Sequence, residues 1–255
     1  MPLVSGCGIL GAAQPVNKTA AQVPILMYHH IAVPPDPRDI RASRLAVPPV
    51  QLEEQLAYFQ RAGYTTISLD DLAAALRDRA ALPDKPVILT FDDGYVDFYT
   101  NAYPLLERYN AKATIYIISG RVGKPGYMTW DELRELAASP LITIGGHTRT
   151  HPQLAQQKPE RVRDELDGGR ADLEQQLGLT VHHLAYPSGS YNAATIEQAQ
   201  KSGYETAVTV HYGIKERADK LLELPRVFVN GGAPLDDLIA GLEGRPKKNQ
   251  PASSD

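Results

Sequence analysis

Cysteine is almost absent from this chain of 255 residues, which contains Cys7 alone. A single cysteine cannot form an intramolecular disulfide, and it cannot supply the several thiolates of a structural zinc site. Any bound metal ion would therefore be held by histidine and carboxylate side chains.

Long hydrophobic runs and a strong charge of either sign are also lacking. The net charge is −4, with 43% hydrophobic and 22% charged residues, which is an ordinary globular composition. Without a basic excess, nucleic acid is not an expected partner, and no basic helix suggests direct binding to a membrane surface. No stretch is long enough to span a bilayer. The length suits one large α/β domain or two small ones.

The first residues carry a short motif, Leu3-Val4-Ser5-Gly6-Cys7, that resembles the lipobox of bacterial lipoproteins. A charged segment and a full apolar segment do not precede it, so a chance run of small residues in a leader is an equal alternative. If the motif is a lipobox, the protein is extracellular or at the cell surface, and a lipid on Cys7 anchors it to the membrane. We expect a leader or linker over 1–22, a folded domain over 23–243 and a disordered tail over 244–255.

Strand-like and helix-like segments alternate through the middle of the chain. The predicted strands are Ile25–Tyr28, Tyr64–Ile67, Val87–Phe91, Ala113–Ile118, Leu141–Ile144, His183–Tyr186, Glu205–Thr209 and Arg226–Val229. The predicted helices are Val50–Arg61, Leu69–Arg79, Asn101–Tyr109, Thr129–Ala138, Pro159–Leu177 and Ala193–Ser202. Repeated βα units imply an α/β fold with a largely parallel sheet, either closed into a barrel or open and doubly wound.

Residues with side chains suited to catalysis lie just past the carboxyl ends of four predicted strands. They are His29, the pair Asp92-Asp93, His147 and Ser188. In a barrel the carboxyl ends of all strands converge on one face, whereas an open sheet gathers only those beside its switch point. The distribution therefore favours a barrel.

Two pairs of residues indicate a metal site. Asp92 and Asp93 follow an apolar strand, and Gly94 permits a sharp turn, so that one carboxylate can bind a metal while its neighbour acts as a base. His147 and His151 follow a second strand. One carboxylate and two imidazoles make a three-ligand set with open positions, typical of a catalytic site. Such ligands suit Zn²⁺, Co²⁺, Ni²⁺ or Fe²⁺.

Three further places are candidates for roles in catalysis. His29 is the expected proton donor to a leaving amine, and His30 is expected to point away from the site. The turn after Tyr186, at Pro187 and Ser188, offers backbone N–H groups to an oxyanion, although a plain turn is an alternative. Arg226 would orient a carboxylate through a bidentate contact or lie on the surface as an ordinary arginine.

These residues resemble the polysaccharide deacetylase family, carbohydrate esterase family 4. Thr90–Tyr95 fits the first motif of the family, and His147–His151 fits the second. The resemblance implies a distorted (β/α) barrel of about seven strands and metal-dependent N-deacetylation of acetamido sugars. It further implies that Asp92 is the general base and that Asp93, His147 and His151 are the metal ligands, with Zn²⁺ as the expected ion.

The third family motif differs here. Ala185 stands where the family often has an arginine that braces the base, and Arg226 is the predicted substitute. The Ser188 N–H takes the place of the oxyanion donor of the family. The resemblance also makes Tyr186, Tyr191 and Trp130 candidates for substrate contact, the last two as a sugar platform.

The position of His29 near the start of the chain resembles one branch of this family. That branch acts on poly-β-1,6-N-acetylglucosamine in biofilm formation. The expected partner is thus an N-acetylglucosamine polysaccharide, and the protein is expected to be a monomer. Deacetylation of peptidoglycan or chitin, acetyl-xylan esterase activity and glycan binding without catalysis remain alternatives.

Overall fold

Seven parallel strands close into a barrel in the computed structural model, which describes residues 19–34, 36–77 and 80–245. The order around the barrel is β2-β4-β5-β6-β7-β8-β10, and the barrel is closed because β2 pairs with both β4 and β10. These strands are β2 (Ile25–Tyr28), β4 (Pro86–Phe91), β5 (Ala113–Ile117), β6 (Ile142–Gly146), β7 (His183–Ala185), β8 (Thr206–Tyr212) and β10 (Leu224–Phe228). The predicted distorted barrel of about seven strands is confirmed.

Three short strands lie outside this ring. β3 (Thr65–Thr66) pairs with the first two residues of β4, and the Thr66 hydroxyl accepts a hydrogen bond from the Lys112 N–H, just before β5. β1 (Ala20–Gln22) and β9 (Lys215–Arg217) form an antiparallel pair. Neither β1 nor β9 was predicted, and β1 lies within the leader predicted over 1–22.

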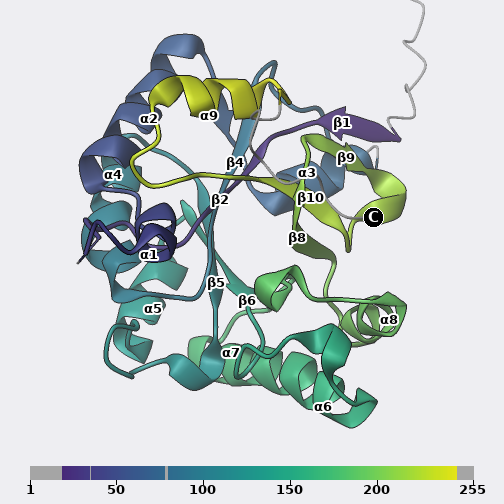
Figure 1. The fold of residues 1–255 in the computed structure, drawn as a ribbon. Coiled ribbons are helices and arrows are strands. Elements are labelled where there is room, and N and C mark those ends of the chain that lie inside the picture. The colour runs from purple at the N-terminus through teal and green to yellow at the C-terminus, as the bar shows by residue number, and fades with distance from the viewer. Residues whose placement is uncertain (1–18, 35, 78–79, 246–255) are drawn as a thin grey trace, which may run out of the picture.

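Helices surround the barrel on its outside (Figure 1). They are α1 (Ile40–Leu45), α2 (Pro49–Ala62), α3 (Leu69–Leu76), α4 (Tyr103–Arg108), α5 (Trp130–Ala138), α6 (Pro159–Arg163), α7 (Gly169–Leu177), α8 (Ala193–Lys201) and α9 (Leu235–Leu242). Short 3₁₀ turns are η2 (Ser119–Arg121), η3 (Leu154–Gln156), η5 (Pro187–Gly189) and η6 (Ala218–Lys220), and π-helical turns are η1 (Phe98–Ala102) and η4 (Asp164–Gly168). No helix of the described residues is long and apolar enough to cross a membrane.

Local sequence explains where several helices begin and end. Ser68 before α3 and Thr129 before α5 each form a capping box with the acidic residue three positions on, which satisfies free backbone N–H groups. Gly63 after α2 and Gly178 after α7 adopt left-handed backbone conformations that glycine takes without steric cost. The helix predicted over Pro159–Leu177 is divided into α6 and α7 by the wider turn of η4. Helices α1 and α9 were not predicted.

Alternation along the strands separates two hydrophobic clusters. Val87, Leu89 and Phe91 of β4 belong to the larger cluster, together with buried residues of several helices. Ile88, between them, belongs to a second cluster with residues from five other barrel strands and from α3. Because successive strand residues point to opposite faces, this second cluster marks the barrel interior.

The same alternation places polar side chains inside the barrel. Thr90 and Asp92 share the parity of Ile88, and Arg226 shares that of Leu224, a member of the interior cluster. Thr90 and Arg226 are 0% and 1% exposed. The upper part of the barrel interior is therefore polar, and it lies directly beneath the carboxyl ends of the strands.

Candidate active site

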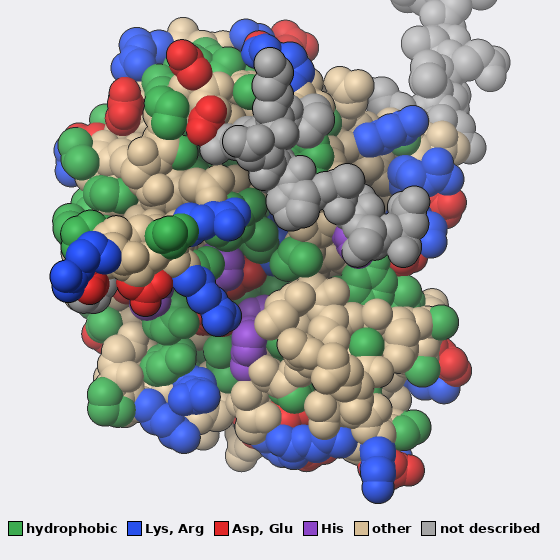
Figure 2. Space-filling model, viewed as in Figure 1, with side chains coloured by type: hydrophobic (Ala, Val, Ile, Leu, Met, Phe, Trp, Pro, Cys, Tyr) green, Lys and Arg blue, Asp and Glu red, His purple; other side chains and the backbone are tan. Residues whose placement is uncertain are grey.

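The predicted site residues gather at the carboxyl ends of the barrel strands. A cavity of about 570 Å³ is lined by His29, Asp92, Asp93, His147, His151, Tyr186 and Ser188, among others. Figure 2 shows histidine and acidic side chains at the floor of a hollow on this face of the molecule. These residues come from four different strand ends, so closure of the barrel is what brings them together.

A larger cavity of about 680 Å³ lies at the opposite end of the barrel, where β3 and β5 begin. Its charged lining residues, Asp71 and Lys112, pair with each other at 2.9 Å. No group of three or more histidine, cysteine or acidic residues suited to a metal ion lies there among the described residues. We therefore assign the candidate active site to the smaller cavity.

Asp93, His147 and His151 form a compact set of ligand atoms, all within 4.8 Å of one another. The Asp93 Oδ1 lies 3.4 Å from His147 Nε2 and 3.5 Å from His151 Nε2. Ligands about 2.0–2.1 Å from a shared tetrahedral ion are about 3.4 Å apart. The two distances from Asp93 are longer than a good hydrogen bond and close to that tetrahedral edge, so this donor set fits a divalent metal ion.

The turn after β4 directs the two aspartates to different tasks. Asp93 and Gly94 both have positive φ, at 78° and 80°. This sharp turn carries Asp93 toward the histidines while Asp92, whose N–H donates to the Tyr28 carbonyl, keeps the direction of the strand. The predicted divergence of the two carboxylates is present.

Arg226 holds Asp92 from inside the barrel. Its Nη1 donates to Asp92 Oδ1 at 2.8 Å, and its Nη2 donates to Oδ2 at 2.7 Å, while its Nε donates to the Thr209 carbonyl. Arg226 therefore makes the bidentate contact with a carboxylate and does not lie on the surface. Burial alone would raise the pKa of Asp92, but the charge and hydrogen bonds of Arg226 hold that pKa below its usual range.

The ring of His147 is oriented by a neighbouring strand. Its Nδ1 lies 2.7 Å from the carbonyl oxygen of Ala185 in β7, a contact in which Nδ1 must be the donor. The Nε2 lone pair is then left free to face Asp93, as a metal ligand requires. The small Ala185 side chain belongs to the barrel interior.

The two adjacent histidines after β2 differ as predicted in direction. His29 lines the cavity, and its Nδ1 is buried without a hydrogen-bond partner among the described residues. His30 stacks on Tyr95 and its Nδ1 lies 2.6 Å from Asp97, outside the site cavity. Burial lowers the pKa of His29, and the negative charges of Asp92 and Asp93 oppose that shift.

The segment after β7 reaches the cavity through Tyr186 and Ser188 but not through Tyr191. Ser188 has a positive φ of 53°, and the Tyr186 hydroxyl donates to the Leu222 carbonyl. Tyr191 stacks on Tyr186 at 4.7 Å and is not among the residues that line the cavity. Trp130 begins α5 and packs against the larger hydrophobic cluster. The predicted platform of Trp130 and Tyr191 is thus not part of this cavity, because both rings pack on other side chains.

The cavity wall also contains residues that the sequence analysis did not single out. Arg41 and Arg44 come from α1, Tyr95 follows the aspartate turn, and Phe228 ends β10. The available signal was proximity to a strand end for Tyr95 and Phe228. No sequence pattern marked Arg41 or Arg44, because α1 is a six-residue helix without buried residues.

Comparison with known proteins gives consistent results. Residues 79–207 match the family model described as polysaccharide deacetylase. The putative polysaccharide deacetylase YxkH of Bacillus subtilis is 32% identical over 83% of this chain and 73% of its own length. The poly-β-1,6-N-acetyl-D-glucosamine N-deacetylase of Escherichia coli is 26% identical over 73% of this chain, and the match spans about a third, 34%, of that relative.

Solved structures share the fold along nearly the whole described chain. The Streptococcus pyogenes deacetylase PplD, in complex with acetate, superposes with a TM-score of 0.80 at 32% identity, covering 88% of this chain and 99% of that one. IcaB from Ammonifex degensii gives a TM-score of 0.76 at 25% identity, covering 88% and 97%.

Proposed function

This chain belongs to the polysaccharide deacetylase family, and we propose that it removes N-acetyl groups from an extracellular N-acetylglucosamine polymer in a metal-dependent reaction. The family membership makes the protein a hydrolytic deacetylase. The observation that carries the proposed chemistry is the meeting of Asp92, braced by Arg226, with the Asp93, His147 and His151 set in one cavity.

Poly-β-1,6-N-acetyl-D-glucosamine is the proposed polymer. Relatives from Escherichia coli and Staphylococcus aureus, at 26% and 22% identity, are named as deacetylases of this polymer. The histidine that lines the cavity from the first barrel strand, His29, supports the same branch. A role in biofilm formation would follow from this substrate.

The donor set would hold one divalent ion through Asp93, His147 and His151. Zn²⁺ is the proposed ion, and Co²⁺, Ni²⁺ and Fe²⁺ accept the same ligands. When bound, the ion would polarise the acetamide carbonyl and acidify the attacking water. All other steps fall to side chains and backbone groups of the chain.

Asp92 would accept the proton of the attacking water. Its pKa is held low, so it is a carboxylate at neutral pH, and each oxygen keeps a lone pair beyond the one that Arg226 occupies. As water adds to the acetamide carbon, the Ser188 N–H would donate to the oxyanion. The C–N bond then breaks, giving acetate and a free amine on the sugar.

His29 would protonate the departing nitrogen. Its Nδ1 is buried, so Nε2 is the atom that can reach a substrate in the cavity. A histidine with a depressed pKa is a stronger acid once it carries a proton, although a smaller fraction carries one at neutral pH. Protonation of the amine would keep it from re-forming the amide.

The location of the protein outside the cytoplasm, with a lipid anchor on Cys7, stays a proposal. Cys7 lies outside the described residues. The monomeric state is likewise proposed.

Acetate release from defined polymers tests the function. Purified enzyme with Zn²⁺ or Co²⁺ should release acetate from poly-β-1,6-N-acetylglucosamine faster than from chitin, peptidoglycan or acetylated xylan. Asp92→Asn and His29→Ala should keep the metal and lose roughly 10²- to 10⁴-fold in rate. His182→Ala is the matched control, because His182 pairs with Glu205 at the other end of the barrel. Turnover near wild type in either site variant would contradict the assigned roles, and glycan binding without acetate release would favour a non-catalytic relative.

A further inference from the structure

The loop that carries His147 and His151 has an unusual backbone. Thr148 and His151 have φ values of 63° and 66°, in the left-handed region that residues with side chains rarely adopt. Such a conformation persists only where the surroundings hold it in place. Within the loop, the Thr148 hydroxyl accepts a hydrogen bond from the His151 N–H at 3.0 Å.

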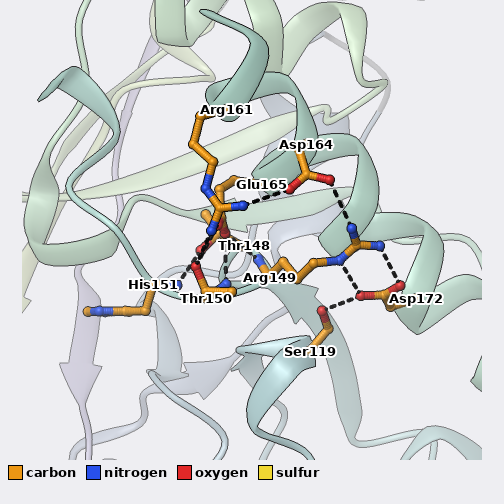
Figure 3. A network of polar contacts seen from close by, with 9 residues as sticks. All are labelled: Ser119, Thr148, Arg149, Thr150, His151, Arg161, Asp164, Glu165 and Asp172. Carbon is orange, nitrogen blue, oxygen red and sulfur yellow. Dashed lines mark hydrogen bonds and ion pairs between the residues drawn. The ribbon is translucent and has the colours of Figure 1, made fainter. Parts of the chain in front are cut away.

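Glu165 accepts hydrogen bonds from this loop on the outside of the barrel (Figure 3). Its side chain is 0% exposed and comes from the π-helical turn η4. Its Oε2 accepts the backbone N–H groups of Arg149 at 2.9 Å and Thr150 at 2.7 Å, and its Oε1 accepts the Thr150 hydroxyl at 2.5 Å. One carboxylate therefore fixes two consecutive peptide groups between the two histidines.

The negative charge of Glu165 is compensated at the surface. Arg161, one turn earlier, places its Nη2 2.6 Å from Glu165 Oε1, and its side chain is 45% exposed. The cation thus sits on the solvent side of the carboxylate, whereas the backbone donors sit on the buried side. Oε2 accepts the two backbone N–H groups, whereas Oε1 faces both Arg161 and the Thr150 hydroxyl.

Arg149 fastens the same loop to the next helix. Its guanidinium donates to both oxygens of Asp172 in α7 at 2.8 Å, and Asp172 also accepts the Ser119 hydroxyl. A Cβ at Gly169 would lie 2.8 Å from the backbones of Thr148 and Arg149. The loop is therefore packed closely against Gly169, where α7 begins directly after η4.

The two histidines depend on this support to different degrees. His147 has its own ring contact to the Ala185 carbonyl, which sets the direction of the ring. Among the described residues, the His151 ring has no hydrogen bond to another residue beyond its approach to Asp93. The ring also meets the His147 ring edge-on, with 4.7 Å between centroids. Figure 3 shows the His151 ring directed away from the network around Glu165, so that network acts on the ring only through the loop backbone.

We propose that Glu165 is a positioning residue that sets the place of His151 as a metal ligand, by accepting hydrogen bonds from the Arg149 and Thr150 peptide groups. The inference rests on the proposed metal site. In this role the position of the Glu165 oxygen matters more than its charge. The two backbone N–H groups need an acceptor at one fixed distance, and a neutral oxygen there would serve as well.

Three substitutions separate geometry from charge. Glu165→Gln keeps a carbonyl oxygen at the reach of both backbone N–H groups and loses the charge. Glu165→Asp keeps the charge and withdraws the acceptor by one methylene. Glu165→Ala removes both. If Glu165 served mainly as an ion-pair partner of Arg161, Glu165→Asp would weaken metal binding less than Glu165→Gln. If it positions the loop, Glu165→Gln would weaken metal binding less than Glu165→Asp.

The readout is the dissociation constant of the purified protein for Zn²⁺, measured by chelator competition, with the visible spectrum of bound Co²⁺ as a report on ligand geometry. Glu165→Ala should weaken binding roughly 10- to 100-fold, the range found when residues that orient metal ligands are removed. Glu165→Gln should stay close to the wild-type value, and Glu165→Asp should fall between Gln and Ala with an altered Co²⁺ spectrum.

Leu52→Ala is the control for general destabilisation, because Leu52 is buried in α2, away from the loop. It should lower the Tm and leave metal affinity unchanged. Equal affinity in all Glu165 variants, Gln weaker than Asp, or failure of all three to fold would each overturn the proposal. A wild-type protein that binds no metal would instead refute the proposed function.

Discussion

The buried pair of Arg226 and Asp92 gives the sharpest test of how this barrel supports its candidate base. The two side chains are 1% and 3% exposed, and two short hydrogen bonds join them. Arg226→Met removes the charge and keeps much of the side-chain length. The Asp92 carboxylate then remains buried without its cation, which costs about 3–5 kcal/mol when one partner of a buried pair is lost.

A double-mutant cycle isolates the pair itself. Asp92→Asn alone leaves Arg226 buried opposite a neutral amide, and the double variant removes both charges. We expect the double variant to be more stable than the sum of the two losses predicts, by about 1–3 kcal/mol, because neither charge is left alone. Urea unfolding of the four metal-free proteins at one pH measures each free energy of unfolding.

Arg77→Met is the matched control, because Arg77 pairs with Glu205 at 2.6 Å with both side chains roughly a third exposed or more. Its loss should be at most about 1 kcal/mol. Arg226→Lys should retain part of the stability, but it should lose acetate release because an ammonium cannot hold both carboxylate oxygens. A loss below about 1 kcal/mol in Arg226→Met, with additivity in the cycle, would refute this reasoning.

Three other predictions concern pH, metal and packing. Burial raises the pKa of Glu216 to about 9 from about 4.5, and neither carboxylate oxygen has a hydrogen-bond partner among the described residues. Because the folded pKa lies above the unfolded one, the contribution of Glu216 to stability is greatest below about pH 4.5 and falls as pH rises toward 9. Glu216→Gln should flatten that curve and stabilise the protein by about 3 kcal/mol at pH 7, as urea unfolding across pH would measure; equal slopes in the two proteins would contradict it. Dialysis against dipicolinate should abolish acetate release, and Zn²⁺ or Co²⁺ should restore it; activity that survives metal-free dialysis, verified by elemental analysis, would count against the metal site. Gly145→Ala should cost about 1–3 kcal/mol, because its Cβ would lie 2.5 Å from the Tyr116 ring; calorimetry showing an unchanged Tm would mean that the ring moves freely.

Much of the barrel was predictable because its strands are short apolar runs, several of which are followed by candidate catalytic or metal-binding residues. Every barrel strand overlaps a predicted one. The boundaries shifted where hydrogen bonding, rather than composition, decides them. β8 runs on to Tyr212, beyond the predicted end at Thr209, because its pairing with β10 continues there past a register shift.

The elements that the sequence did not reveal have weak local signals. α1 has no buried residue, and β1 and β9 are three residues long and depend on each other across about 195 positions of the chain. A pairing of that separation has no periodic signature in either segment. The placement of Trp130 and Tyr191 was missed for a related reason. The neighbours of an aromatic ring depend on the tertiary fold, so the sequence alone does not predict whether the ring faces the cavity or the core.

The burial of Arg226 could have been predicted from the alternation of side chains along the strands. Leu224 and Arg226 share one face of β10, and Ile88 and Thr90 share one face of β4, with Asp92 next in that alternation just after the strand. Once the strands close into a barrel, both charged side chains are buried in its interior, where an unpaired arginine or aspartate would be costly. The arginine that the family resemblance placed at position 185 is an alanine, which itself belongs to the interior cluster. Arg226 on β10 donates to both oxygens of Asp92, and one carboxylate needs only one such partner. Arg226 therefore braces Asp92 from β10, in the role that the resemblance gave to an arginine at position 185.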